Sequence, residues 1–332
     1  MDEISNSAAQ RIVVLGTGGT IAGSGGAAGD NISYVAGTIG VNDLLAGIKA
    51  PPGYELVVEQ VAQLDSKDMD FAVWQQLTQR CVYWLSQPNV AGIVITHGTD
   101  TIEETSFFLH EVLALQSKPV VLTCAMRPAT ALSPDGPQNL LDAVTVAAKP
   151  GAAGVVVVCA GEIHGANDVR KAHPYRVNAL DSGDAGPIGY VEEHEVRLVR
   201  SWPSAAVPYN PRLAELVEGC ASWPRVEILT SHAGAHPSLI NALIRERAEG
   251  NSEAVDGLVL AATGNGTLHH ELESAALRAQ DADITVWRAS RCLNGRILPK
   301  PGDQIPDTGT LSPVKARISL ILSLLIRQMG KE

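Results

Sequence analysis

The sequence predicts an α/β protein with a larger N-terminal domain, built on a doubly wound and mostly parallel sheet, and a smaller C-terminal α/β domain. Short apolar runs bounded by glycine alternate with longer segments whose apolar residues recur every three or four positions. This alternation is typical of buried parallel strands joined by helices. The length of 332 residues and the hydrophobic content of 45% are sufficient for two cores.

A proline-rich segment marks the expected division between the domains. Residues 201–211 (SWPSAAVPYNP) contain three prolines and no hydrophobic periodicity, which is typical of a connection. We therefore expect an N-terminal domain at residues 1–200, a linker at 201–222 and a C-terminal domain at 223–332.

The first expected strand, residues 11–15, runs into a loop rich in glycine and threonine. Its glycines allow a tight turn and a close approach to a ligand, and they leave two reactive side chains, Thr17 and Thr20. A dinucleotide-binding loop is disfavoured because its last glycine is replaced by Ile21, and the Gly-Lys-Ser/Thr ending of a nucleotide P-loop is absent. An ordinary tight connection with exposed threonines stays open at this point.

The segment that follows, residues 23–34, is rich in glycine and alanine and ends at Tyr34. It can be a flexible surface loop, or a lid that carries Tyr34 over a site. The next expected elements are a helix at 41–48, a strand at 54–61 and a helix at 69–85 whose aromatic stripe predicts core packing. Further strands are expected at 92–96, 120–124 and 154–159, and helices at 102–113 and 138–148.

The smaller domain repeats the pattern, and its expected elements occupy residues 226–230, 239–247, 258–262, 272–279, 285–288 and 314–329. In the larger domain, a second threonine loop, residues 97–101 (HGTDT), follows the strand at 92–96. Ligands of open α/β sheets collect at the carboxyl ends of strands. Both threonine loops lie at such ends, so they can face one pocket.

These motifs resemble those of the bacterial-type L-asparaginases, the asparaginase/glutaminase family. The resemblance covers almost the whole chain, and the matching motifs occur in the family's order. They are residues 17–22 (TGGTIA), 96–101 (THGTDT), 65–69 (DSKDM), 125–128 (AMRP), 135–140 (DGPQNL), 168–171 (DVRK) and 264–266 (GNG). Each motif is short, but the ordered set is specific.

The resemblance implies a role for each matching residue. Thr20 is the nucleophile with Tyr34 beside it, whereas Thr99, Asp100 and Lys171 form a second group that activates water or relays protons. Binding of the substrate falls to Ser66 for the α-carboxylate, to Asp100 for the α-ammonium, and to the backbone near Thr99 and Ala125 for the side-chain amide. Covalent amide hydrolysis needs such a nucleophile, a base and oxyanion donors, and a lysine can serve as the base only when neutral.

Two departures from the family pattern concern the same site. Lys67 stands where the family often has Gln or Glu, which changes the charge near the α-groups of the substrate. A glutamate that some members supply from the neighbouring subunit aligns with Gly302, next to Asp303. Asn265 matches another residue that reaches the site from the neighbour.

Composition and the remaining motifs exclude several other classes. The net charge of −11 disfavours nucleic acid and anionic membranes as partners, and the apolar run 318–326 is too short to span a bilayer. Five widely spaced cysteines without Cys-x-x-Cys indicate free thiols and no zinc knuckle. The histidines at 232, 236, 269 and 270 bring no nearby set of carboxylates or thiols with ligand spacing, and H-E-x-x-H is absent, so no metal site is expected. Residues 1–10 lack the features of a signal peptide, which favours a soluble, cytoplasmic protein.

Together the motifs predict a cofactor-free enzyme that hydrolyses L-asparagine to L-aspartate and ammonia through an acyl-threonine intermediate. The resemblance further implies a homotetramer, a dimer of dimers with sites at subunit boundaries. Two alternatives stay open: an amidohydrolase that prefers L-glutamine or another amide, and an amino-acid sensor without activity. Retention of Lys171 favours an enzyme, because a binding protein has no need of it.

Overall fold

The computed structural model describes residues 9–27, 29–113, 117–203 and 212–329. The chain divides into two compact units, Met1–Glu218 and Gly219–Glu332. Residues 1–8 and 204–211 lie outside the described residues. They include most of residues 1–10, in which no signal peptide is expected, and part of the expected linker.

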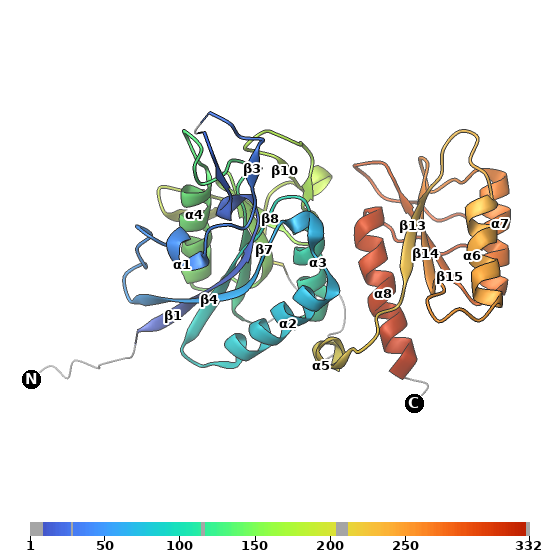
Figure 1. Cartoon of the computed structure of the whole chain (residues 1–332), viewed down its shortest axis with the longest axis horizontal. Helices are drawn as coiled ribbons and strands as arrows, with labels where there is room; N and C mark the ends of the chain where they lie inside the picture. Colours follow the sequence, from blue (N-terminus) through green and yellow to red (C-terminus); the bar gives the residue numbers. More distant parts are fainter. Residues whose placement is uncertain (1–8, 28, 114–116, 204–211, 330–332) are drawn as a thin grey trace, which may run out of the picture. The chain divides into compact units, whose positions relative to one another are not determined.

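An eight-stranded sheet forms the centre of the first unit (Figure 1), in the order β12-β11-β8-β7-β6-β5-β1-β4. Five neighbouring strands are parallel: β4 (Tyr54–Leu64), β1 (Gln10–Gly18), β5 (Val90–Thr96), β6 (Pro119–Thr123) and β7 (Gly154–Cys159). Three antiparallel strands extend the sheet beyond β7, namely β8 (Glu162–Gly165), β11 (Gly189–Glu192) and β12 (Glu195–Leu198). The expected mostly parallel sheet is confirmed, and the antiparallel extension is an addition to it.

Helices cover both faces of this sheet, as a doubly wound fold requires. On one side, α4 (Gly136–Ala148) and α1 (Val41–Leu44) lie against alternate side chains of the strands, such as Ile12, Val14 and Val94. On the other side lie α2 (Phe71–Ser86) and α3 (Ile102–Val112). The predicted aromatic stripe is core: Trp74 is buried and stacks on Phe108 with ring centroids 4.5 Å apart.

Several short elements complete the first unit near the carboxyl ends of the parallel strands. They are the 3₁₀ turns Thr20–Ala22, Ser66–Asp68 and Gly183–Ala185, and two small antiparallel pairs, β2 (Ser24–Gly25) with β3 (Tyr34–Val35) and β9 (Arg170–Lys171) with β10 (Leu180–Asp181). A helix not foreseen from the sequence, α5 (Arg212–Gly219), lies within the range expected to be a linker. Gln75 Nε2 donates to the carbonyl oxygens of Val217 and Glu218 at 2.9 Å, so α5 is tied to α2.

The second unit is a three-stranded parallel sheet with helices on both faces, as expected. Its order is β13 (Val226–Thr230), β14 (Gly257–Ala262) and β15 (Thr285–Ser290). α8 (Pro313–Met329) covers one face, and α6 (Ser238–Ala248) and α7 (His270–Asp281) cover the other. Gly257 lets α8 approach, because a β-carbon there would lie 2.9 Å from Leu320 Cδ2.

Within the described residues, no helix combines the length and apolar character needed to cross a membrane. The same residues contain no group of three or more His, Cys, Asp or Glu side chains that could hold a metal ion. All five cysteines are free thiols, and three of them, Cys81, Cys124 and Cys159, are buried.

Candidate active site

The loop after β1 is built by glycines that no other residue could replace without rearrangement. Residues Ile12–Leu15 are fully buried, and the chain then turns at Gly18 (φ 102°) and Gly19 (φ 81°). A β-carbon at Gly18 would lie 2.4 Å from the carbonyl oxygen of Leu64, and Gly19 N donates to the same oxygen at 2.8 Å. The turn delivers Thr20 to the start of a 3₁₀ turn at the carboxyl end of the strand.

Thr20 and Tyr34 form a direct pair. Thr20 Oγ1 lies 2.6 Å from Tyr34 Oη, and the Thr20 residue is 8% exposed. Tyr34 belongs to β3, whose antiparallel pairing with β2 returns the chain to Thr20. The ring packs so closely that a β-carbon at Gly23 would lie 2.8 Å from Tyr34 Cδ2. The structure therefore brings together the two residues that the sequence assigns to the first group.

The second threonine loop packs on the first without intervening side chains. A β-carbon at Gly19 would lie 2.3 Å from Gly98 Cα, and one at Gly98 would lie 2.4 Å from Ser66 Oγ. Thr17 Oγ1 also donates to Thr96 O at 2.8 Å, at the end of β5. The loops after β1 and β5 thus form one continuous surface with the Ser66 turn.

Lys171 reaches this surface from β9 and contacts both residues of the second group. Its Nζ donates to Thr99 Oγ1 at 2.8 Å and to Asp100 Oδ1 at 2.5 Å. Thr99 is 4% exposed, whereas half of the Asp100 side chain (51%) faces solvent. An amine, a hydroxyl and an accessible carboxylate therefore converge at the end of β5.

The Ser66 turn is tied to the same loop through its side chain and its main chain. Asp100 N donates to Ser66 Oγ at 3.2 Å, and Thr101 Oγ1 donates to Ser66 O at 2.7 Å. Ser66 is 2% exposed. Its hydroxyl is thereby placed beside the main chain of Asp100.

Lys67, the departure beside Ser66, is held by carboxylates. Its Nζ lies 2.8 Å from Asp65 Oδ2 and 3.1 Å from Asp68 Oδ2, and 61% of its side chain is exposed. The hydrogen bond to Asp65 is the main cause that raises the pKa of Lys67, and the bond to Asp68 adds to it. The positive charge at this position is therefore balanced locally.

A third loop, after β6, is held in place by the carboxylate of Asp135. Asp135 accepts hydrogen bonds from Met126 N and Arg127 N, each at 2.9 Å. Ala125 is buried in a small apolar cluster with Ile21 and Ala22, which are part of the Thr20 turn. The Ala125 backbone thus lies next to the first threonine loop.

The side chain of His97 holds the second threonine loop in place through hydrogen bonds to Gly98 and Thr105. Its Nδ1 lies 2.7 Å from Gly98 O, which can only accept, so Nδ1 carries the proton and Nε2 accepts from Thr105 Oγ1 at 2.9 Å. Trp74 Nε1 donates to the same Thr105 hydroxyl at 2.9 Å. Burial lowers the pKa of His97 to about 4, so the ring is neutral near pH 7.

Asn265 and Asp303 lie in the second unit, where both side chains hold loops in place. Asn265 Nδ2 donates to Leu298 O at 2.9 Å, and its Oδ1 accepts from Leu298 N at 2.7 Å. Asp303 pairs with Arg288, and this contact lowers the pKa of Asp303. Arg288 Nη1 also donates to Gly266 O at 3.3 Å, which links the two loops.

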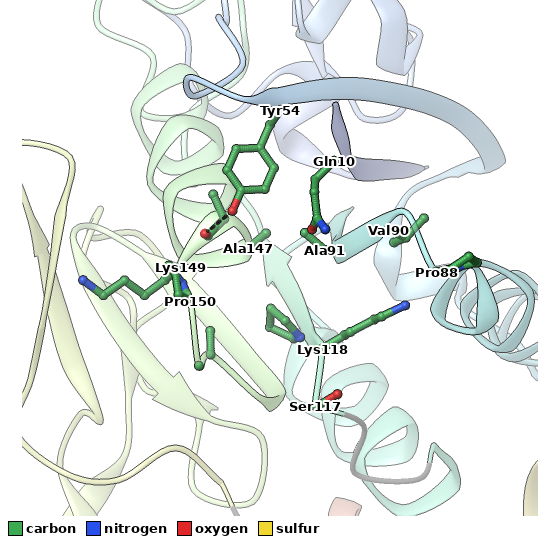
Figure 2. Close-up of a pocket in the computed structure, with 14 residues that line it drawn as sticks. Gln10, Tyr54, Pro88, Val90, Ala91, Ser117, Lys118, Ala147, Lys149 and Pro150 are labelled. Atoms are coloured by element: carbon green, nitrogen blue, oxygen red, sulfur yellow. Dashed lines mark hydrogen bonds between the residues drawn. The ribbon is translucent and has the colours of Figure 1, made fainter. Parts of the chain in front are cut away.

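A separate pocket lies at the opposite, amino end of the parallel strands and contains none of the predicted site residues. Figure 2 shows Gln10, Tyr54 and Lys118 around it. Two of its polar side chains have structural partners: Tyr54 Oη donates to Ala148 O at 2.9 Å, and Lys118 Nζ donates to the carbonyl oxygens of Leu85 and Gln87, near the end of α2. The contacts of Thr20 with Tyr34 and of Lys171 with Thr99 and Asp100 lie instead at the carboxyl edge.

Three residues of this carboxyl edge could not be identified as contributors from the sequence: His97, Glu103 and Asp135. Glu103 accepts a hydrogen bond from Lys171 N, and Asp135 accepts from Met126 N and Arg127 N. His97 contacts the carbonyl of the adjacent Gly98 and the side chain of Thr105. The sequence alone does not reveal these partners. The motifs THGTDT and DGPQNL contain two of them, so a buried histidine and a carboxylate just before a helix were the available signals.

Comparison with known proteins finds two family models that together cover most of the chain. Residues 11–204 match the family model described as "Asparaginase, N-terminal", and residues 225–331 match "Glutaminase/Asparaginase C-terminal domain". A probable periplasmic L-asparaginase of Haemophilus influenzae is 35% identical, with 94% of this chain and 88% of that protein covered. A glutaminase-asparaginase of Pseudomonas fluorescens is 32% identical, with coverage of 97% and 88%.

Among solved structures, the crystal structure of a probable cytoplasmic L-asparaginase from Campylobacter jejuni is similar over 95% of both chains. The TM-score is 0.83 and the sequence identity is 32%. The fold of this chain is therefore shared with that protein.

Proposed function

The chain belongs to the L-asparaginase (asparaginase/glutaminase) family of amide-hydrolysing enzymes, and we propose that it hydrolyses L-asparagine to L-aspartate and ammonia through an acyl-threonine intermediate on Thr20. The observation that carries this proposal is the convergence of two pairs at one edge of the sheet. One is Thr20 with Tyr34 (2.6 Å), and the other is Thr99 with Lys171 (2.8 Å).

In the first half of the reaction, Thr20 Oγ1 attacks the carbon of the side-chain amide. The Thr20 proton passes to Tyr34 Oη while the Tyr34 proton moves toward the departing nitrogen, so ammonia leaves and Tyr34 ends neutral. Backbone N–H groups of the loops at Thr99 and Ala125 stabilise the oxyanion. The product of this half is an aspartyl ester of Thr20.

In the second half, water attacks the ester carbon. Thr99 and Lys171 accept the water proton, for which Lys171 must be in its amine form, and a proton returns to Thr20 Oγ1 as aspartate is released. Asp100, half exposed beside Lys171, receives the α-ammonium of the substrate, and Ser66 receives the α-carboxylate. This assignment uses the polar groups that converge at the edge and needs no cofactor or metal.

We also propose that the enzyme is a homotetramer, a dimer of dimers in which Asn265 of a neighbouring copy completes the site. The family's subunit arrangement supports this assignment. Analytical ultracentrifugation at dilute concentration tests it, because a fully active monomer would contradict a shared site. A cytoplasmic location is supported by the free cysteines and by the description of the Campylobacter jejuni enzyme, and it can be tested by cell fractionation.

Preference for L-glutamine is the second candidate, favoured by the description of the Pseudomonas fluorescens relative as a glutaminase-asparaginase. A sensor without activity is the third, and the retained contact of Lys171 with Thr99 argues against it. Ammonia release measured with L-asparagine, L-glutamine and D-asparagine separates the three. Release fastest from L-asparagine supports the proposal, release fastest from L-glutamine replaces it, and binding without release indicates a sensor.

A further inference from the structure

Lys171 is carried by a very short strand that is not part of the main sheet. β9 consists of Arg170 and Lys171 and pairs with β10 in a separate two-stranded sheet. A two-stranded pair of this size is marginally stable alone. Contacts from outside the pair must therefore contribute to the position of Lys171.

Glu103 provides such a contact to the main chain of Lys171. Lys171 N donates to Glu103 Oε2 at 2.8 Å, a hydrogen bond strengthened by the charge of the carboxylate. The next amide, Ala172 N, donates to Ala179 O at 2.8 Å on the opposite side. Because successive N–H groups of a strand point in opposite directions, the Lys171 amide faces α3 and Glu103 accepts its hydrogen bond there.

The helix that bears Glu103 is a rigid support. Glu103 lies in the first turn of α3, whose side chains Ile102, Phe107 and Leu109 are at most 1% exposed. Thr101, the residue that caps this helix, donates through its hydroxyl to Ser66 O at 2.7 Å. One helical turn therefore holds the Ser66 turn, follows directly on Thr99 and Asp100, and reaches Lys171.

We propose that Glu103 is a positioning residue for the amine of Lys171. By fixing the main chain of Lys171 to α3, it sets the reach of Nζ to Thr99 Oγ1 at 2.8 Å. The lysine stem is flexible, so a displaced main chain could keep the contact with the exposed Asp100 carboxylate and lose the contact with Thr99. This inference rests on the proposed function, in which Lys171 and Thr99 act on the water.

Steady-state kinetics of Glu103→Ala and Glu103→Gln test the inference. Glutamine keeps a carbonyl acceptor for the Lys171 amide, whereas alanine removes it. We expect kcat of Glu103→Ala to fall by about 10- to 100-fold, the effect of a displacement near 1 Å, with a smaller change in KM. Glu103→Gln should stay within about threefold of the wild type. Glu104→Gln is the matched control for Glu103→Gln. Glu104 lies in the same first turn of α3, so both variants remove one negative charge that interacts favourably with the helix dipole.

Three kinetic outcomes would overturn the inference: wild-type kcat in Glu103→Ala, equal losses in Glu103→Ala and Glu103→Gln, or an equal loss in Glu104→Gln. If Glu103→Ala does not fold, Glu103→Asp decides, since its shortened carboxylate cannot reach the amide and wild-type kcat there would contradict the role. Crystal structures of the variants add a readout independent of activity. The distance from Lys171 Nζ to Thr99 Oγ1 should exceed about 3.5 Å, the limit of a hydrogen bond, in Glu103→Ala and not in Glu103→Gln. A failure of the proposed function appears differently, as wild-type protein that releases no ammonia from L-asparagine.

Discussion

The two threonine loops of the first unit end adjacent strands, but their threonines are held in different ways. The described partner of Thr20 is Tyr34, at 2.6 Å, which comes from a hairpin of two-residue strands. In this hairpin region Ile32 is 77% exposed and Val35 is 64% exposed. Few buried contacts mean low local stability, so we expect the pairing of β2 with β3 to open and close readily.

Thr99, in contrast, lies in a network supported by buried elements. Lys171 donates to its hydroxyl, Glu103 holds the main chain of Lys171, and the buried His97 ring holds the Gly98 carbonyl next to it. Under the proposed mechanism this difference corresponds to a division of labour: Thr20 has a partner that we expect to move as substrate enters, and Thr99 is held in place to act on water.

The largest expected effect comes from removing the hydroxyl of Thr20, the proposed nucleophile. Thr20→Ala should lower kcat by about 10⁴-fold or more, as expected when a covalent route is lost. The change removes only a hydroxyl and a methyl group, so the variant should fold, and circular dichroism serves as the control. Wild-type-like ammonia release from this variant would move the nucleophile elsewhere.

Removal of the Thr99 hydroxyl should give a smaller loss and a different signature. Thr99→Val keeps the approximate shape of the side chain and deletes the hydroxyl that contacts Lys171. We expect the rate of deacylation to fall by about 10²- to 10³-fold and the rate of acylation to fall by less. Intact-protein mass spectrometry after mixing with L-asparagine should then detect an aspartyl adduct, mapped by digestion to Thr20. Wild-type turnover would remove Thr99 from the mechanism, and an adduct on another residue would erase the proposed difference between the loops.

Removal of the Tyr34 hydroxyl tests the role of the partner of Thr20. Tyr34→Phe keeps the ring that packs beside Gly23 and removes the proton relay, so we expect kcat to fall by about 10²-fold with an unchanged melting temperature. Tyr175→Phe is the matched control, because Tyr175 is 60% exposed. A burst of ammonia in Tyr34→Phe as large and fast as in the wild type would show that Tyr34 does not act in acylation.

The buried histidine beneath the Thr99 loop, His97, should make the stability of the fold sensitive to acid. The pKa of His97 is lowered to about 4 from 6.5 by burial, so the unfolded chain binds a proton first as the pH falls. The free energy of unfolding should therefore drop between pH 6.5 and about 4, by about 3 kcal/mol for this residue, and level off below that range. Burial also lowers the pKa of His164 to about 4, so it adds to the effect.

Urea unfolding at several pH values measures this linkage. His97→Gln should reduce the acid-side decline relative to the wild type, while His164→Gln reduces it independently. An identical decline in wild type and His97→Gln would show that the histidine is not held neutral in the fold.

Lys67 gives the smallest expected effect. Its exposed ion pairs with Asp65 and Asp68 contribute little to stability, so Lys67→Gln should leave the melting temperature unchanged. Any consequence should appear in KM for L-asparagine, because this side chain adjoins Ser66. A large fall in kcat would place Lys67 among the catalytic groups, against the division of labour between the two threonine loops.

The sequence allowed prediction of the parallel strands and both threonine loops, because buried strands and glycine turns are local patterns. The strand at 154–159 has the predicted bounds. The antiparallel strands β11 and β12 were not predicted, since they are short and β12 is largely exposed. α5 escaped prediction because its neighbours 203, 208 and 211 are prolines, which obscured a short helix that packs against Gln75.

At the site, the positions of Thr20, Thr99 and Asp100 followed from strand ends. Lys171 could be placed near the same edge because it follows the strand at 154–159, but its role depended on the family resemblance. Its strand has two residues, too few for any periodicity, and Glu103 lies 68 residues away from it in the chain. Contacts of this kind arise only after the tertiary fold has formed. Local sequence could therefore identify the reactive groups at the strand ends but not what holds Lys171 in place.

The close contact between Gly19 and Gly98 has a consequence for attempts to change the substrate specificity of this enzyme. Since each β-carbon would fall within the backbone of the other loop or on Ser66, saturation libraries at these two positions should return glycine alone among active clones. Adaptation to a longer or differently charged amide must then proceed at the rim, through Lys67 and the loop that Asp135 clamps, where side chains can vary without separating the two threonine loops.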